Sequence, residues 1–327
     1  MHFLKKNYRV PEFHPAQEKI LLRNRRDREG SNWINKAANF IRAKFSGANI
    51  YYNYIRYEES LFTQPFVNFC EQIKDEEIEE VTGIKIPEKY KRSLGHTFSI
   101  ECGWDCSTHL CGSDTVKETE LDLISAFEKY FKKDFFNCIV GRDVKSLWDA
   151  DKKIICIHLR LEDVSRRKLN DQGIVSDHKR IKNYIEKNKL FKTDGRRGQK
   201  RLISQVPSRI ADLKRFIDKL KVSYPSHQVH FITAPGSGRR VREELSGYEV
   251  HVPDKNEALW SMINSDILVV SRSMFSAMAG FLHQGALVYY PPWGFYTAMG
   301  LGTKFDKTEN WEPACIDGGG IREGNFI

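Results

Sequence analysis

The stretch KIICIHLRLED at residues 153–163 decides the fold. Its first part, Lys153–Leu159, is almost continuously apolar and rich in β-branched residues, which predicts a buried strand of a parallel sheet. The strand is followed by a cation and two carboxylates, Arg160, Glu162 and Asp163. Because ligands of open α/β sheets bind beyond the carboxyl ends of the strands, this polar end is a predicted ligand site.

Further strand patterns, alternating with helix patterns, follow toward the C-terminus. Short β-branched runs predict strands, and the amphipathic stretches between them predict helices. The strands are Gln228–Thr233, Tyr248–Val252, Asp266–Val270 and Ala286–Tyr290, and the helices are Ser208–Val222, Gly238–Leu245, Asn256–Asn264 and Met274–His283. Ser208 and Asn256 are the predicted N-caps of the first and third helices. This alternation predicts a doubly wound, Rossmann-like domain over residues 151–327.

The N-terminal half is less regular but begins in the same way. Strands are expected at Lys19–Asn24 and Ala48–Tyr52, and helices at Asn32–Phe45, Pro65–Ile73 and Glu118–Phe131. A chain of 327 residues exceeds the roughly 250 at which single cores stop growing. We therefore expect a second α/β domain over residues 1–150, with the boundary placed just before the best strand.

Composition restricts the class of protein. With 40% hydrophobic and 29% charged residues the chain is globular, and no window approaches the ~20 apolar residues that a membrane span needs. The first six residues, MHFLKK, lack the apolar run of a signal peptide. Seven cysteines, an odd number, fit reduced thiols better than a disulfide framework. A soluble, cytoplasmic protein is the expectation.

One cluster of possible metal ligands stands apart from the strands. Cys102, Cys106, His109 and Cys111 lie within ten residues, and zinc prefers thiolate and imidazole ligands. Their spacing matches no common zinc motif. Packed thiols in an irregular loop are the alternative interpretation.

The net charge of +9 arises from one segment, residues 166–201, which holds 13 Lys and Arg against 4 Asp and Glu. A nucleic-acid-binding surface usually adds stacking aromatics, and this segment has only Tyr184 and Phe191. We therefore expect no nucleic-acid partner. A solvated insertion and a lid over an anionic ligand both remain open.

Arg160 is the first candidate binding residue. It and His158 alternate with apolar residues, so both side chains leave the predicted strand on one face. The planar fork of an arginine grips phosphate oxygens in a way that lysine cannot reproduce. A salt bridge from Arg160 to Glu162 or Asp163 is the structural alternative.

A second candidate is the serine-rich turn SRSMFS at residues 271–276, between a predicted strand and a predicted helix. The N-terminus of a helix presents unpaired N–H groups and partial positive charge to an anion. Ser273 and Ser276 could add hydroxyl donors. The alternative is that Ser271 or Ser273 caps the helix while Phe275 enters the core.

The third candidate is the turn NRRDREGSNW at residues 24–33, which joins the first predicted strand to the first predicted helix. Gly30 allows close approach of a ligand to the backbone, and Glu29 precedes it. The turn lacks a G-x-G-x-x-G pattern. Taken alone it predicts a βα turn with Asn32 as the helix cap.

Taken together, the three segments resemble fucosyltransferase-like glycosyltransferases of the GT-B type, including viral and microbial members. Their order matches an early E-G-x-N turn, a central strand end of the form H-x-R and a late S-x-S-x-F-S turn. The E-G-x-N turn is similar to that of a protein O-fucosyltransferase subgroup. The resemblance spans residues 19–290 and implies two Rossmann-like domains that face an interdomain cleft.

The resemblance also implies roles for individual residues. Glu29 is the catalytic base by this match, and Asn32 contacts the donor. His158 and Arg160 correspond to the residues that hold the nucleotide diphosphate, and Asp163 is the rival for the role of base. The turn beneath the phosphates corresponds to Ser271, Ser273, Phe275 and Ser276.

The implied activity is inverting, metal-independent transfer of a sugar from a nucleotide diphosphate donor to a hydroxyl of a glycan or glycoprotein, with no cofactor. GDP-fucose is the first choice of donor. The segment 234–238, APGSG, lacks the acidic residues that read part of the base in the family, so UDP-xylose is the second choice. A non-catalytic protein that binds nucleotide sugars or glycans is the first alternative of another class, and a nucleic-acid-binding protein that acts through residues 166–201 is the second.

Overall fold

The computed structural model describes five longer segments of the chain, residues 144–149, 151–160, 210–234, 239–291 and 309–314. Toward the N-terminus it describes residues 11–12, 19–23, 30, 33–34, 36–37, 40, 49–53, 64–73, 77, 80, 98–99, 117–118, 124 and 127–139. The chain divides into two compact units. Residues 1–143 with 295–309 form the first, and residues 144–294 with 310–327 form the second. Among the described residues, no helix is long and apolar enough to cross a bilayer.

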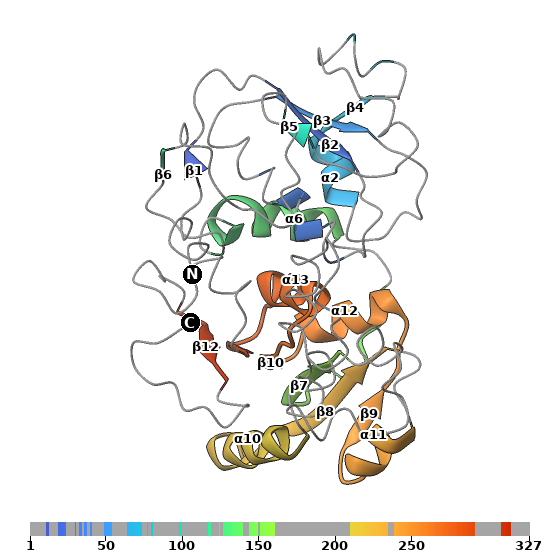
Figure 1. Cartoon of the computed structure of the whole chain (residues 1–327), viewed down its shortest axis with the longest axis vertical. Helices are drawn as coiled ribbons and strands as arrows, with labels where there is room; N and C mark the ends of the chain where they lie inside the picture. The colour runs from blue at the N-terminus through green and yellow to red at the C-terminus, as the bar shows by residue number, and fades with distance from the viewer. Residues whose placement is uncertain are drawn as a thin grey trace, which may run out of the picture. The chain divides into compact units, whose positions relative to one another are not determined.

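The second unit contains a sheet of six parallel strands (Figure 1). They are β7 (Ile154–Leu159), β8 (Gln228–Thr233), β9 (Glu249–His251), β10 (Ile267–Val269), β11 (Leu287–Tyr290) and β12 (Trp311–Pro313). Their spatial order is β12-β11-β10-β7-β8-β9, so the chain runs outward from β7 to β9 and then returns to the other side of β7. This is the Rossmann strand order, and the α/β class is confirmed.

Four helices accompany this sheet among the described residues of the unit. They are α10 (Ile210–Ser223), α11 (Arg239–Glu244), α12 (Lys255–Ile263) and α13 (Met274–Leu282). The predicted strands and helices of residues 210–290 are confirmed to within about two residues at each end. The edge strand β12 was not predicted, because three residues containing a proline carry almost no strand signal.

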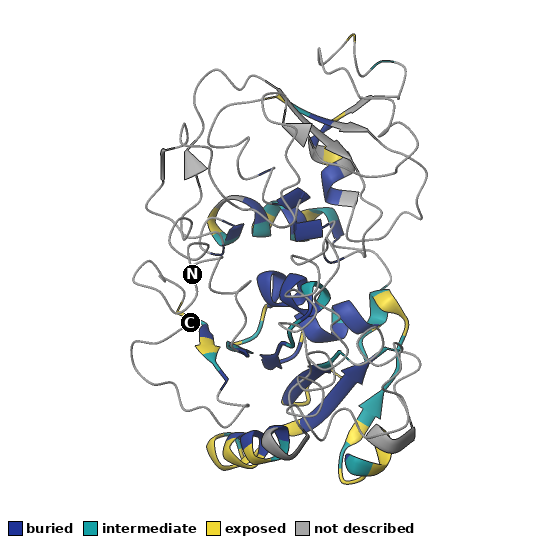
Figure 2. Cartoon of the chain, in the orientation of Figure 1, coloured by how far each residue is buried: buried dark blue, intermediate teal, exposed yellow. Residues whose placement is uncertain are grey.

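The two faces of this sheet differ in polarity. One face, here called the apolar face, packs Ile155, Ile157, Val229 and Phe231 against the apolar side of α10. Alternate residues of the same strands, among them His158 and His230, lie on the opposite face, here called the mixed face. Helices α12 and α13 pack together and cover the mixed face: α12 contacts β7, and Phe275 of α13 contacts His158. Figure 2 shows the central strands largely in the colour of buried residues, between α10 and the pair α12 and α13.

The start of β7 is fixed to the start of β10 by one carboxylate. The backbone N–H of Ile154 donates to Asp266 Oδ2 at 2.7 Å, and the backbone N–H of Asp266 donates to the carbonyl of Ile154 at 3.1 Å. Gly285, in the turn before β11, packs so closely that a Cβ would overlap the carbonyl oxygens of Ser265 and Asp266. Glycine is therefore required in that turn, and these contacts set the register of β7, β10 and β11.

The N-cap of α12 corrects one prediction. The side chain of Asp254 accepts hydrogen bonds from the backbone N–H groups of Asn256 at 2.8 Å and Glu257 at 3.0 Å. The predicted cap, Asn256, lies inside the first turn instead. Both residue types are good caps, so local preference could not place the helix start between them. The other predicted cap, Ser208, lies outside the described residues.

The first unit has a four-stranded sheet of order β4-β3-β2-β5. Strands β2 (Lys19–Arg23), β3 (Asn49–Asn53) and β4 (Glu71–Ile73) are parallel, and β5 (Phe98–Ser99) pairs antiparallel with β2. A separate antiparallel pair joins β1 (Pro11–Glu12) to β6 (Lys117–Glu118). The two strands predicted in this half are confirmed.

Two predicted helices of this half are wrong in extent. The helix expected at Pro65–Ile73 is α2 (Gln64–Phe69), and the chain then enters β4. The helix expected at Glu118–Phe131 begins later, since Glu118 is in β6, and continues through the π-helical turn η2 (Glu128–Lys132) into α6 (Lys133–Ile139). Apolar spacing of three and four residues did not reveal that β4 extends the sheet.

A cluster of aromatic side chains forms the described core of the first unit. The ring of Trp33 lies 5.3 Å from that of Phe127 and 5.8 Å from that of Phe135, centroid to centroid. Phe66 of α2 stacks on Phe131 at 5.3 Å. Offset and edge-on aromatic pairs of this kind add about 0.5–1.5 kcal/mol each beyond area burial. This cluster joins α2 and α6 to the helical residues around Trp33.

The described cysteines fit the expectation of reduced thiols. Cys138 and Cys156 are free thiols. Burial raises the pKa of Cys70 to about 12 and raises that of Cys156 as well, so both stay protonated and unreactive at neutral pH. The cluster of Cys102, Cys106, His109 and Cys111 lies outside the described residues.

Candidate functional site

The candidate site lies at the carboxyl ends of β7 and β10, the two neighbouring strands at the centre of the sheet. The chain winds to one side from β7 and to the other side from β10, so the point between them is the topological switch point. Doubly wound sheets bind ligands outside the strand ends at this point. His158 and Arg160 lie at the end of β7, and the turn 271–276 follows β10.

His158 joins these two segments. Its Nδ1 lies 2.8 Å from the hydroxyl oxygen of Ser271, and its ring lies 5.9 Å from the ring of Phe275. Burial, with a smaller contribution from the charge of Arg160, lowers the pKa of His158 to about 3. The imidazole is therefore neutral at physiological pH. A neutral ring has one donor and one acceptor nitrogen, so it can hold Ser271 and still act as a polar contact.

Arg160 reaches the same turn. Its Nη1 donates to the backbone carbonyl of Arg272 at 3.0 Å. Since a guanidinium carries five N–H donors, this bond fixes its direction while other donors serve further partners. The alternative partners considered from the sequence, Glu162 and Asp163, lie outside the described residues. The positive charge is thus placed at the switch point by a bond to the neighbouring segment.

The serine turn is organised by its own hydroxyls. Ser273 caps α13 by accepting from the backbone N–H of Phe275 at 3.3 Å, as the capping interpretation expected. Ser276 is fully buried, and its hydroxyl accepts from the backbone N–H of Ser271 at 3.1 Å and lies 3.2 Å from the carbonyl of Ser273. Phe275 is half-buried against His158 instead of deep in the core.

The arrangement offers an anion three kinds of favourable group. Arg160 provides a full charge, the N-terminus of α13 provides a partial positive charge and backbone N–H groups, and the neutral ring of His158 adds a polar atom. The described residues of this edge, 158–160 and 270–276, contain no carboxylate. The site is therefore suited to bind a negatively charged group such as a phosphate.

Other predicted residues lie outside the part of the chain that the structure describes. They are Glu29, Asn32 and Asp163, together with the basic segment 166–201. Gly30 is described and is buried in helical backbone. The predicted roles of Glu29, Asn32 and Asp163 therefore stay predictions.

One group of polar side chains was missed by sequence reasoning. His230, Glu249 and His251 bring a carboxylate oxygen and two ring nitrogens together on β8 and β9. Glu249 and His251 are two residues apart in a strand, which is the spacing of side chains on one face. That spacing was a usable signal, but the partner in β8 could not be found without the strand register.

The chain matches no protein-family model and no curated protein sequence. Among solved structures it is similar to the fucosyltransferase NodZ from Bradyrhizobium, with 12% identity over 82% of this chain and 94% of that one, at a TM-score of 0.36. It is also similar to POFUT1 in complex with GDP-fucose, with 12% identity over 84% of this chain and 97% of that one, at a TM-score of 0.39. At these values the likeness is distant and assigns no role to any residue.

Proposed function

We propose that the protein is a glycosyltransferase of the GT-B type that binds a nucleoside diphosphate sugar at the carboxyl ends of β7 and β10. The observation that carries the proposal is the junction of Arg160 with the turn at the N-terminus of α13. It places a cation and a helix N-terminus at the switch point of a Rossmann-ordered sheet, where a diphosphate is the natural ligand.

In the proposed site each residue has a distinct task. Arg160 contacts the diphosphate, and Ser273 and Phe275 present the N-terminal turn of α13 to it. His158 forms a hydrogen bond with the hydroxyl of Ser271, and the buried hydroxyl of Ser276 donates to the backbone carbonyl of Ser271 and so stabilises the turn. The donor is GDP-fucose as first choice and UDP-xylose as second, and the acceptor is a hydroxyl of a glycan or glycoprotein.

The proposed reaction is a single displacement with inversion. A carboxylate takes the proton of the acceptor hydroxyl, the acceptor oxygen attacks the anomeric carbon, and the bond from that carbon to the diphosphate oxygen breaks. Negative charge then develops on the departing diphosphate. Groups preorganised around that charge stabilise the transition state more than the ground state. Arg160 and the α13 turn supply this stabilisation in the proposal, without a divalent ion.

A nucleotide panel tests the donor class. We expect GDP, or else UDP, to raise the melting temperature of the protein, because a ligand at 100 times its Kd adds about 2.7 kcal/mol to the stability of the folded state. The matching sugar nucleotide with a glycan acceptor should then release free nucleotide. Binding of neither diphosphate would reject the proposal, and binding without turnover for any acceptor would favour a non-catalytic sugar-nucleotide-binding protein.

The catalytic base is tested by two matched substitutions. Glu29→Gln keeps size and hydrogen bonding but cannot accept the proton, so we expect turnover to fall by roughly 10²–10⁴ with donor affinity unchanged. Asp163→Asn is the control, because a carboxylate close to Arg160 in sequence is a weaker base if the two are paired. Near-normal turnover in Glu29→Gln with loss in Asp163→Asn would transfer the role to Asp163.

A further inference from the structure

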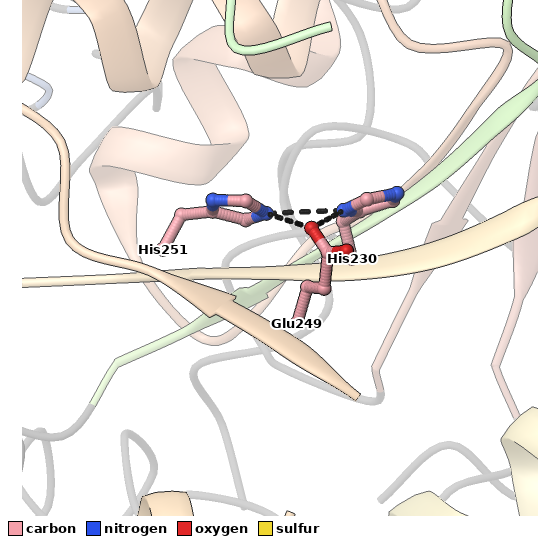
Figure 3. Close-up of side chains that lie close together, drawn as sticks. All are labelled: His230, Glu249 and His251. Carbon is pink, nitrogen blue, oxygen red and sulfur yellow. Dashed lines mark hydrogen bonds and ion pairs between the residues drawn. The ribbon is translucent and has the colours of Figure 1, made fainter. Parts of the chain in front are cut away.

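Three potential metal ligands converge on the mixed face of the sheet, at its β9 edge. His230 of β8 lies beside Glu249 in the parallel register, and His251 follows two residues later on the same face of β9 (Figure 3). Both strands run in the same direction, so the three side chains leave the sheet together. Neither the donor site nor the proposed reaction uses any of them.

The spacing of their ligand atoms is that of a metal coordination sphere. His230 Nδ1 lies 3.0 Å from His251 Nε2, and Glu249 Oε2 lies 3.4 Å from the first nitrogen and 3.5 Å from the second. Nitrogen and oxygen ligands at ~2.0–2.1 Å from a tetrahedral zinc ion are about 3.3 Å apart. The three atoms therefore form one face of a tetrahedron of the right size.

Hydrogen bonds alone explain the close approach of these three atoms less well than a metal ion does. His230 Nε2 lies 3.4 Å from Gln228 Oε1, and in the tautomer with the ring proton on Nε2 the imidazole donates to this amide oxygen. Nδ1 then presents a lone pair to the other two ligands. A proton on His251 Nε2 could serve His230 Nδ1 or Glu249 Oε2 with good geometry, but not both. A cation placed among the three atoms satisfies all of them.

Neighbouring side chains hold the two histidines in place, as residues around a metal site usually do. A metal-binding histidine normally donates its second ring N–H to an acceptor that fixes its orientation, and Gln228 provides that acceptor. Trp148 packs on both imidazoles, with ring centroids at 5.5 Å from His230 and 5.9 Å from His251. Trp148 is itself held by a 2.9 Å hydrogen bond from Nε1 to the carbonyl of Ser261 in α12.

We propose that His230, Glu249 and His251 bind a Zn²⁺ ion. Two imidazoles and one carboxylate form a set that zinc accepts, whereas Ca²⁺ and Mg²⁺ require oxygen ligands. The Glu249 side chain is 71% exposed, so water reaches the fourth coordination position. The ion joins β8 to β9, a strand of only three residues at the edge of the sheet.

We expect the ion to stabilise the pairing of β9 with β8. His230 is level with Cys156 of β7, and His251 is level with Ile232 of β8 and through it with His158, so strand β8 separates the zinc ligands at the β9 edge from His158 on β7. The proposal is independent of the proposed function. Loss of zinc should lower the stability of the second unit and leave the binding of a nucleoside diphosphate to the folded protein unchanged.

Zinc titration of the chelator-treated full-length protein against a competing chelator tests the proposal. We expect His251→Ala and Glu249→Gln each to remove one equivalent of bound Zn²⁺ or weaken it at least about 10-fold, and Gln228→Ala to weaken it by about 10- to 100-fold. His227→Ala is the control, since His227 lies on the same unit outside the cluster. Equal zinc binding by the wild-type protein, His251→Ala and Glu249→Gln would overturn the proposal.

Cobalt distinguishes this site from the cysteines at 102–111. A site of two imidazoles and a carboxylate gives Co²⁺ visible d–d bands without the near-ultraviolet charge-transfer absorption of a thiolate ligand. We expect Glu249→Gln, a change at an exposed side chain that preserves the fold, to reduce the visible bands. At the same zinc concentration it should also show a smaller rise in Tm than zinc causes in the wild-type protein. If the bands and the Tm rise persist undiminished in that variant, the three residues are not the ligands.

Discussion

The two faces of the six-stranded sheet have the same strands but different contents. The apolar face presents Ile155, Ile157, Val229 and Phe231 to helix α10. The mixed face presents His158 and His230 to the region covered by α12 and α13. One face is a hydrophobic core, and the other carries the proposed donor site and the proposed zinc site.

In this unit the apolar face chiefly supports stability, and the proposed binding sites lie on the mixed face. Removing apolar surface from water is the main stabilising term in folding, and the side chains named on the apolar face are all hydrophobic. Each polar group on the mixed face costs desolvation and is retained through specific bonds, such as that of His158 to Ser271. Substitutions on the two faces should therefore change different measured quantities.

The largest effect is expected on the apolar face. Phe231 is fully buried and packs edge-on against Tyr248 at 5.4 Å, so Phe231→Ala removes a large side chain and leaves a cavity. We expect a loss of about 3–5 kcal/mol in the free energy of unfolding, measured with chemical denaturant. Nucleotide affinity of the remaining folded protein should be unchanged.

Val222→Ala is the matched control for that measurement. Val222 belongs to α10, which covers the same face, but its side chain points outward and is 83% exposed. Its substitution should change the free energy of unfolding by less than about 0.5 kcal/mol. A similar loss in both variants would mean that the apolar face does not dominate stability.

The contrast between the faces also explains what sequence could predict. Strands β7 to β11 were predictable because each is a short apolar run between helical stretches, and their order follows from the doubly wound pattern. The placement of His158 and Arg160 at the carboxyl end of β7 followed from the same reasoning. Alternation along β7 indicated that both residues share a face.

Contacts between distant segments could not be predicted in this way. The bonds of His158 to Ser271 and of Arg160 to the carbonyl of Arg272 each span more than a hundred residues. The approach of His230 to Glu249 depends on the exact register of two strands. Local patterns fix which face a side chain occupies, but register and helix packing decide which side chain it meets.

On the mixed face, Arg160→Ala is expected to weaken the binding of the nucleoside diphosphate. It removes the charge at the switch point, and a hydrogen bond to a charged group is worth roughly 1.5–3 kcal/mol. We expect the affinity for the nucleoside diphosphate to fall by about 10- to 150-fold by calorimetry, since each 1.4 kcal/mol is a factor of ten. Arg160→Lys should recover only part of it, because lysine lacks the planar fork.

The control for Arg160 lies on the other side of the sheet. Arg215 is an exposed residue of α10, and Arg215→Ala removes one positive charge from the protein without touching the switch point. Equal losses of affinity in Arg160→Ala and Arg215→Ala would indicate general electrostatic attraction in place of a defined site.

The buried His158 makes the mixed face sensitive to acid. The pKa of His158 is about 3 in the folded protein, below the ordinary 6.5, because burial disfavours the charged ring. The unfolded chain therefore binds a proton more readily, and the stabilising contribution present above pH 6.5 is lost as the pH falls toward 3. At pH 5 this loss is up to about 2 kcal/mol.

Urea denaturation at pH 7.5 and pH 5 measures this contribution. His158→Asn keeps a polar group beside Ser271 but cannot titrate, so it should lose less stability between the two pH values than the wild-type protein does. His227→Asn, a substitution outside the sheet, should lose as much as the wild-type protein. A wild-type-like pH dependence in His158→Asn would show that His158 is not the group responsible.

The smallest effect is expected at the N-terminus of α12, one of the helices that cover the mixed face. Asp254→Ala removes the acceptor of two backbone N–H groups, and losing such a cap costs typically ~1 kcal/mol. Asp254→Asn should cost much less, because asparagine is an equally good cap.

The predicted cap, Asn256, serves as the discriminating control. Its side-chain oxygen is buried without a hydrogen-bond partner, so Asn256→Ala removes an unsatisfied group and should be neutral or slightly stabilising. Denaturant unfolding of the three variants decides which residue begins the helix. If Asn256→Ala lost more stability than Asp254→Ala, the helix would begin where the sequence alone had placed it.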